Sequence, residues 1–187
     1  MPNVAIFLDG AYVEKVFVYD HNRPKVDFSK LVHAIAAPDE LLRTYYYHCL
    51  PYKSNPPTIE ESTRFASRQR FYDKLGTIPR FQVRLGKLVY RGTDVNGGKI
   101  FIQKKVDIMV GVDMVTLAAK GKIARVVLFS GDSDLIPAVE AVKGEGVVVT
   151  LWHGSFGEHT SPSQDLYQIC DERKLLSADV IAGCLLP

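Results

Sequence analysis

RVVLFSGDSDL, residues 125–135, joins an apolar strand to two carboxylates at a turn that contains glycine. The apolar half is typical of a strand buried on both faces of a sheet, and Asp132 and Asp134 follow it directly. The N-terminal stretch repeats this arrangement, because the apolar run Val4–Leu8 leads into Asp9. If the two strands are neighbours in a parallel sheet, their acidic ends meet at one edge. The sequence therefore predicts a cluster of carboxylates.

The composition is that of an ordinary soluble globular protein. The chain has 187 residues, of which 47% are hydrophobic and 24% charged, and we expect one domain over residues 1–187. No segment approaches the apolar length of a membrane span and no secretory signal is recognisable, so we expect a cytoplasmic protein without membrane association. Cys49, Cys170 and Cys184 are widely spaced and odd in number, which favours buried free thiols over disulfides or a zinc site.

Short apolar strands alternate with helical patterns along the chain. A helix predicted at Phe28–Ala36 has Asp27 as its N-cap, and a helix at Val106–Ala119 ends before Gly121. Strands that alternate with helices imply right-handed crossovers and a doubly wound α/β sheet. The predicted strands are Val4–Leu8, Leu41–Leu50, Arg125–Phe129 and Gly146–Trp152, and the other helices are Ile59–Leu75 and Asp134–Lys143.

One region departs from this alternation. Phe81–Tyr90 has the alternating pattern of a strand, and Lys99–Gln103 follows it after a glycine-rich turn, so we predict a β-hairpin insertion. Residues 64–105, which include the hairpin, carry eleven Lys and Arg but only two Asp. A basic flank beside an acidic focus suits a polyanion held near metal ions. The candidate binding residues are Lys104, Lys105, Arg64, Arg68, Arg84 and Arg91.

The aspartates at the strand ends have the chemistry of a metal site. In open α/β sheets ligands bind outside the carboxyl ends of the strands, where Asp9, Asp132 and Asp134 are expected, and Asp107 joins them if its helix begins at that edge. Clustered carboxylates stay ionised only with a compensating cation, and their hard oxygens favour Mg²⁺ or Mn²⁺. Such an ion activates water and orients a phosphate, so we predict that these four residues bind it and catalyse phosphodiester hydrolysis.

Each of these residues also has a structural interpretation. Asp commonly caps a helix after a strand, and Asp-Gly is a common turn pair, so the joint placement carries the prediction. Asp113 lies about 120° round the helix from Asp107, which makes it as readily a surface carboxylate as a supporting one. The groups that could contact a bound water or phosphate around the site are Gly10, Asp113, Ser130 and Ser133.

Three motifs resemble the NYN domains, a PIN-like nuclease group that includes the LabA and DUF88 proteins. They are Phe7-Leu-Asp-Gly10, Gln103-Lys-Lys-Val-Asp107 with Val112-Asp113, and Ser130-Gly-Asp-Ser-Asp-Leu135. The resemblance spans nearly the whole chain and implies a PIN-like, Rossmann-like three-layer α/β/α sandwich with a mainly parallel central sheet. It also assigns the four aspartates to the acidic metal pocket of the family. Many such domains have Asn after the first Asp, where this chain has Gly10.

By this resemblance we expect a metal-dependent endoribonuclease that cleaves RNA with Mg²⁺ or Mn²⁺. The alternative is a non-catalytic regulatory module that binds RNA or protein and retains the acidic pocket. A phosphoaspartate hydrolase is disfavoured, because Asp9-Gly10-Ala11 lacks the D-x-D pair such an enzyme places after its first strand. The Pro51–Pro57 loop and the apolar tail Val180–Pro187 are candidate contacts in a homodimer, although core packing explains the tail equally well.

Overall fold

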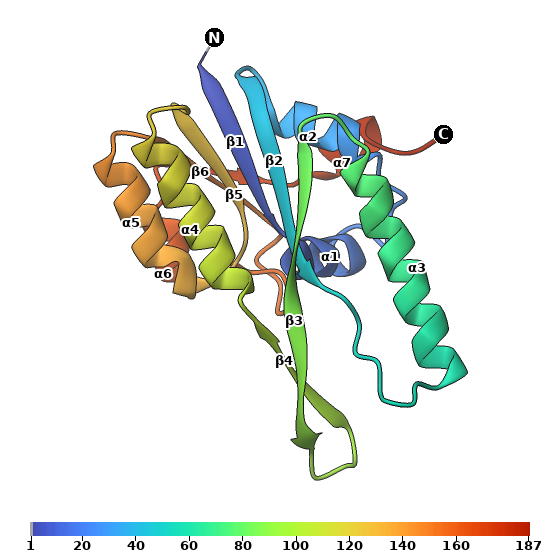
Figure 1. The fold of residues 1–187 in the computed structure, drawn as a ribbon. Coiled ribbons are helices and arrows are strands. Elements are labelled where there is room, and N and C mark those ends of the chain that lie inside the picture. Colours follow the sequence, from blue (N-terminus) through green and yellow to red (C-terminus); the bar gives the residue numbers. More distant parts are fainter. Residues whose placement is uncertain (1) are drawn as a thin grey trace.

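The computed structural model describes residues 2–187 and shows a seven-stranded sheet flanked by helices (Figure 1). The strands lie in the order β4-β3-β2-β1-β5-β6-β7, and every neighbouring pair is parallel except β3 and β4. The expected α/β fold with a mainly parallel sheet is thereby confirmed. The strands are β1 (Asn3–Asp9), β2 (Glu40–Cys49), β3 (Phe81–Thr93), β4 (Lys99–Lys104), β5 (Arg125–Phe129), β6 (Val148–His153) and β7 (Glu172–Leu175).

The helices cover both faces of the sheet and complete three layers. One apolar core lies between the sheet and α1 (Gly10–Tyr19), α2 (Phe28–Ala36), α3 (Ile59–Gly76) and α7 (Ala178–Gly183). The second core lies between the sheet and α4 (Val106–Ala119), α5 (Ile136–Gly144) and α6 (Gln164–Ile169). The two groups stand on opposite sides of the sheet in Figure 1. Within residues 2–187 no helix combines the length and the apolar character that crossing a bilayer requires.

Strand β1 occupies the centre of the sheet because its side chains are apolar on both faces. Val4, Ile6 and Leu8 belong to one core, whereas Ala5 and Phe7 belong to the other, and all five are fully buried. Alternate side chains of a strand point to opposite faces, and both faces of a parallel sheet are covered by helices. The strand therefore ends, at Asp9, at the edge of the sheet between the two helical layers.

Most predicted helix limits agree with the structure. Asp27 caps α2 as predicted, because its Oδ1 accepts hydrogen bonds from the N–H groups of Ser29 and Lys30 at 2.9 and 3.2 Å. The helix predicted from Asp134 begins later. A single 3₁₀ turn, η1 (Ser133–Leu135), follows the capping Asp132, and α5 starts at Ile136 with a proline in its first turn. Proline is well tolerated there because the first-turn N–H groups have no partner within the helix.

The predicted hairpin is present, but it extends β3 rather than being inserted between complete strands. The first half of β3 pairs with β2 from Phe81 to Gly86, and the second half pairs antiparallel with β4 from Lys87 to Thr93. The outer part projects from the body of the protein (Figure 1). In its turn, Asp94 Oδ1 accepts hydrogen bonds from two backbone N–H groups at 2.8 Å.

The C-terminal tail packs on the same chain. The N–H of Asp27 donates to the carbonyl of Cys184 at 2.7 Å, and the N–H of Leu186 donates to the carbonyl of Lys25 at 2.8 Å. Ile181 and Cys184 are buried in the core beside α2. Packing within the chain therefore accounts for Ile181 and Cys184, whereas Leu185 and Leu186 are exposed and a homodimer contact there stays a prediction. All three cysteines are free and buried, as predicted.

Candidate functional site

A cavity of about 550 Å³ lies at the carboxyl ends of β1 and β5. Asp9, Asp107 and Asp132 line it, so the structure brings together three aspartates from three separate parts of the chain. Asp134 does not line the cavity, and its side chain is exposed. The lining residues are Asp9, Ala11, Tyr12, Lys15, Gln103, Asp107, Gly131, Asp132, Ser133, His159, Ser161 and Ser163.

Asp9 ends β1 and caps α1 at the same time. Its Oδ1 accepts hydrogen bonds from the N–H groups of Ala11 and Tyr12 at 3.1 and 3.2 Å, and its Oδ2 accepts one from the Ser130 hydroxyl at 3.1 Å. Burial raises the pKa of Asp9, the hydrogen bonds from Tyr12 and Ser130 oppose this rise, and the charge of Asp107 adds to it. Asp9 is thus a fixed carboxylate whose negative charge is costly because the side chain is buried.

Asp132 follows β5 and caps the turn η1. Its Oδ1 accepts a hydrogen bond from the N–H of Asp134 at 2.9 Å, and its own N–H donates to the Ser130 hydroxyl at 3.2 Å. Ser130 is completely buried, and its hydroxyl group links Asp9 to Asp132 through these two hydrogen bonds. Ser133 joins them in the cavity wall. Ser130 thus supports the carboxylate of Asp9, whereas its contact with a bound water or phosphate stays a prediction.

Asp107 enters the cavity from the other helical layer. Lys105 has a left-handed backbone with φ of 75°, which turns the chain from β4 into α4 and places Asp107 in the first helical turn. The side chain of Asp107 is exposed but partly desolvated by the cavity wall, which raises its pKa, and the charges of Asp132 and Asp134 raise the pKa further. Asp107 therefore lies close enough to both residues to feel their charge, and a cation would relieve this repulsion.

Asp113, one of the four supporting candidates, lies outside the cavity. It accepts a hydrogen bond from the Tyr47 hydroxyl at 2.8 Å and forms an ion pair with Arg84 at 2.9 Å. It is absent from the cavity lining. Its position on α4 thus fastens this helix to the sheet, and it also occupies Arg84, one of the predicted binding cations.

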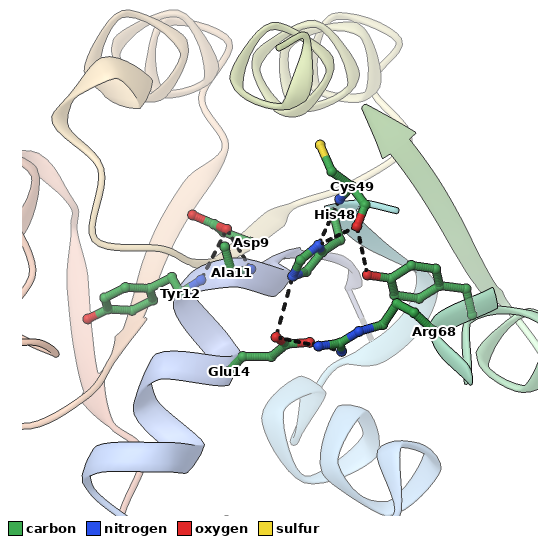
Figure 2. A network of polar contacts seen from close by, with 8 residues as sticks. Asp9, Ala11, Tyr12, Glu14, His48, Cys49 and Arg68 are labelled. Atoms are coloured by element: carbon green, nitrogen blue, oxygen red, sulfur yellow. Dashed lines mark hydrogen bonds and ion pairs between the residues drawn. The ribbon is translucent and has the colours of Figure 1, made fainter. Parts of the chain in front are cut away.

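The predicted cations fall into two groups. Lys104, Lys105, Arg64 and Arg91 are exposed, as binding to a polyanion requires. Arg84 and Arg68 are instead engaged by Asp113 and by Glu14. Arg68 donates to both carboxylate oxygens of Glu14, and the His48 Nε2 lies 3.5 Å from one of them (Figure 2). This network joins α1, β2 and α3 directly behind Asp9.

The His48 network is held in place by the backbone. The Nδ1 of His48 lies 2.7 Å from the backbone nitrogen of Cys49 and 3.0 Å from its carbonyl oxygen, and this contact directs Nε2 towards Glu14. Burial raises the pKa of Glu14, but contacts with His48 and Arg68 outweigh it and lower the pKa below its usual value. Glu14 therefore stays ionised at neutral pH and holds the Arg68 guanidinium within the protein.

Gly10 has a packing explanation. A Cβ atom at this position would lie 2.6 Å from the Tyr46 Cζ and 2.7 Å from the His48 Cδ2. We expect Gly10→Asn, which restores the residue typical of related domains, to destabilise the fold by about 1–3 kcal/mol through overpacking. Urea unfolding of the two proteins measures this difference. Equal stability would show that the Tyr46 and His48 rings move aside at little cost.

Three functional candidates were missed or discounted on sequence grounds. Lys15 lines the cavity from α1, and the capping residue Asp9 is the signal that could have revealed that helix. Gln103 reaches the cavity from β4. His159 also lines the wall, and the centre of its ring lies 4.2 Å from that of Tyr19.

Comparison with known proteins identifies the family. The NYN domain family matches residues 3–175. The chain is a member of the NYN domain family. NYN domains are a PIN-like nuclease family that typically uses divalent metal ions. No curated protein matches this NYN chain. Its fold is similar to that of a protein of unknown function from Vibrio parahaemolyticus, with 21% identity, a TM-score of 0.64, and coverage of 99% of this chain and 96% of the other.

The carboxylates of this NYN cavity suit a hard cation. The protein would supply only some of the ligands of this ion. Across residues 2–187, no three His, Cys, Asp or Glu side chains lie close enough together to hold an ion by themselves. Mg²⁺ is commonly bound by one or two carboxylates and completes its octahedron with water and substrate phosphates. Asp107 and Asp132, which repel each other across the cavity, are therefore the residues that fit this mode of binding.

Proposed function

We propose that this NYN protein is a metal-dependent endoribonuclease that hydrolyses RNA phosphodiester bonds. The observation that carries the proposal is the convergence of Asp9, Asp107 and Asp132 on one cavity. Each comes from a different element, and the burial and mutual repulsion that raise the pKa values of Asp9 and Asp107 are what a bound cation would relieve. Capping accounts for Asp9 and Asp132 one at a time, but it does not require Asp107 to lie within reach of the charge of Asp132.

The residues around the cavity have separable roles in this reaction. Asp107 and Asp132 would hold Mg²⁺ or Mn²⁺, while Asp9, fixed by its three hydrogen bonds, would orient the attacking water. When bound, the ion supplies Lewis-acid chemistry, in that it orients the phosphate and makes water nucleophilic at neutral pH. Asp134, which is exposed beside the cavity, would act through its charge on Asp107.

Cations on both sides of the cavity would bind the RNA backbone. Lys15 lines the α1 side, and Lys104 and Lys105 precede Asp107 on the hairpin side. Contacts of Lys and Arg with phosphates supply affinity and register without reading the sequence of bases. Arg64 and Arg91 are exposed farther out and would extend this basic surface.

Cleavage of labelled RNA tests the proposal. We expect the wild-type protein to produce internal cuts with Mn²⁺ or Mg²⁺ and none with EDTA. Restoring activity by adding the metal in excess of EDTA excludes damage by the chelator, and a 3′-blocked or circular RNA distinguishes internal cleavage from exonuclease action. Absence of metal-dependent cleavage on single-stranded and structured RNA would remove the assignment.

A non-catalytic RNA-binding module is the second candidate, and one observation favours it. Asp9 and Asp132 both serve as caps, so part of the acidic cluster has a structural use. In that case RNA binding would persist in EDTA with no turnover in any metal. Anisotropy of labelled RNA, measured beside the cleavage assay, separates the two candidates.

A further inference from the structure

Three aromatic rings pack together at the hairpin, and we name them the aromatic platform: Tyr52 from the loop after β2, and Tyr90 and Phe101 from the hairpin itself. Their ring centroids are 5.2 to 6.0 Å apart, so each ring contacts the other two. Tyr90 is 41% exposed, and the other two rings are half-buried. Such an arrangement leaves one large aromatic ring open to the solvent on a support formed by two others.

The aromatic platform is continuous with the cavity along β4. Gln103 lines the cavity, and Phe101 is two residues before it on the same strand. Residues two apart in a strand point to the same face, about 7 Å from each other. Tyr90 is directly opposite Phe101 in the register of the hairpin. A chain that leaves the cavity past Gln103 therefore meets the platform next.

The charge of the hairpin indicates an anionic occupant. Residues 87–104 carry four Lys or Arg and one Asp, and Lys87 is directly opposite Lys104, where like charges destabilise a strand pair. These two lysines lie on the face of the hairpin opposite Phe101. Neither lysine has an acidic partner within 4.0 Å in residues 2–187. On the face of the platform, Lys99 lies 5.8 Å from the centre of the Tyr52 ring and also forms an ion pair with Glu61 at 3.5 Å. A phosphate backbone would offset this repulsion, whereas an apolar protein surface would leave it buried.

We infer that the aromatic platform binds unpaired bases of the RNA on one side of the cleaved phosphate, so that the substrate is a single-stranded segment. The inference rests on the proposed nuclease function and specifies its substrate. Aromatic side chains stack on any base that is free of its neighbours, while cations follow the backbone. In a duplex the bases are already stacked and paired. The exposed Tyr90 ring would then have no base face to contact, and only the phosphate contacts would remain.

Binding in EDTA tests the inference separately from cleavage. The probe is a labelled single-stranded 12-mer of adenosines, measured by anisotropy at fixed salt, with a duplex of the same length in parallel. We expect Tyr90→Leu, which keeps an apolar side chain but removes the ring, to weaken single-strand binding about five- to tenfold. Tyr90→Phe keeps the ring and should bind as tightly as wild type. Neither variant should change duplex binding.

Ile102→Ala is the matched control on the same hairpin. Ile102 is 45% exposed, but it points to the opposite face of β4 from Phe101. The inference is overturned if wild type fails to bind the single strand in EDTA, if Tyr90→Leu binds it like wild type, or if Ile102→Ala is equally impaired. It is also overturned if Tyr90→Leu changes the oligomeric state in sedimentation with RNA binding intact, because the platform would then be a protein contact. Loss of cleavage with this binding pattern preserved would instead refute only the nuclease function.

Discussion

Replacing Asp132 with asparagine is expected to lower the rate of RNA cleavage by about a hundredfold or more, with the fold intact. Altering residues that only support metal ligands already costs 10- to 100-fold, and Asp132 is a candidate ligand. The amide oxygen of Asn can still accept the hydrogen bond that Asp134 N–H donates to Asp132 Oδ1, so the cap of η1 is kept. What is lost is one negative charge in the cavity. Initial rates at saturating Mn²⁺ and urea unfolding measure the two effects.

Asp134→Asn is the matched control, because it makes the same chemical change two residues away. Asp134 lies outside the cavity lining, and its connection to the site is its charge near Asp107. We therefore expect a clearly smaller loss of rate than for Asp132→Asn. If Asp132→Asn cleaves at the wild-type rate, Asp132 is not a ligand. If the two variants lose the same activity, the distinction drawn from the cavity is wrong.

The sequence was most informative where local chemistry dictates geometry. Val4–Leu8 and Arg125–Phe129 are apolar at every strand position or nearly so, which occurs when both faces of a strand are covered. Placing them as parallel neighbours brings Asp9 and Asp132 to the same edge, and the structure has that arrangement. Asp27 and the basic hairpin were recognisable for the same reason, because capping and turn formation depend on adjacent residues.

Features that depend on distant partners could not be predicted. The pairing of Arg68 with Glu14 and of Arg84 with Asp113 joins residues 54 and 29 positions apart, so both arginines looked available for RNA. Strand β7 has the sequence Glu172-Arg-Lys-Leu175, whose polar side chains conceal a strand at the edge of the sheet. Asp134 belongs to the turn η1, which no sequence period encodes, and it lies outside the cavity lining.

Replacing Asp107 with asparagine is expected to make the metal-free protein more stable at neutral pH. The pKa of Asp107 is raised by burial and by the charges of Asp132 and Asp134 above the ordinary value of 3.8. Between 3.8 and that raised value the folded state holds more protons than the unfolded state, so stability falls as pH rises through this window. Asparagine carries no charge, so the variant does not lose this stability as the pH rises. The gain should be modest, because the side chain is exposed to solvent, and it should vanish as pH falls towards about 4.

A bound metal ion should reverse the order of stability, so that the wild type becomes more stable than the Asp107→Asn variant. If Asp107 is a ligand, a hundredfold excess of Mn²⁺ over its dissociation constant stabilises the wild type by about 2.7 kcal/mol, whereas the variant gains little. Thermal unfolding in EDTA and in Mn²⁺, at pH 7 and pH 4.5, separates this effect from helix capping. The negative charge in the first turn of α4 favours the helix by about 0.3–1 kcal/mol at any pH where it is ionised. A variant less stable than wild type in EDTA at pH 7 would mean that this helix effect outweighs the repulsion in the cavity, and equal stabilisation of both proteins by Mn²⁺ would remove Asp107 from the site.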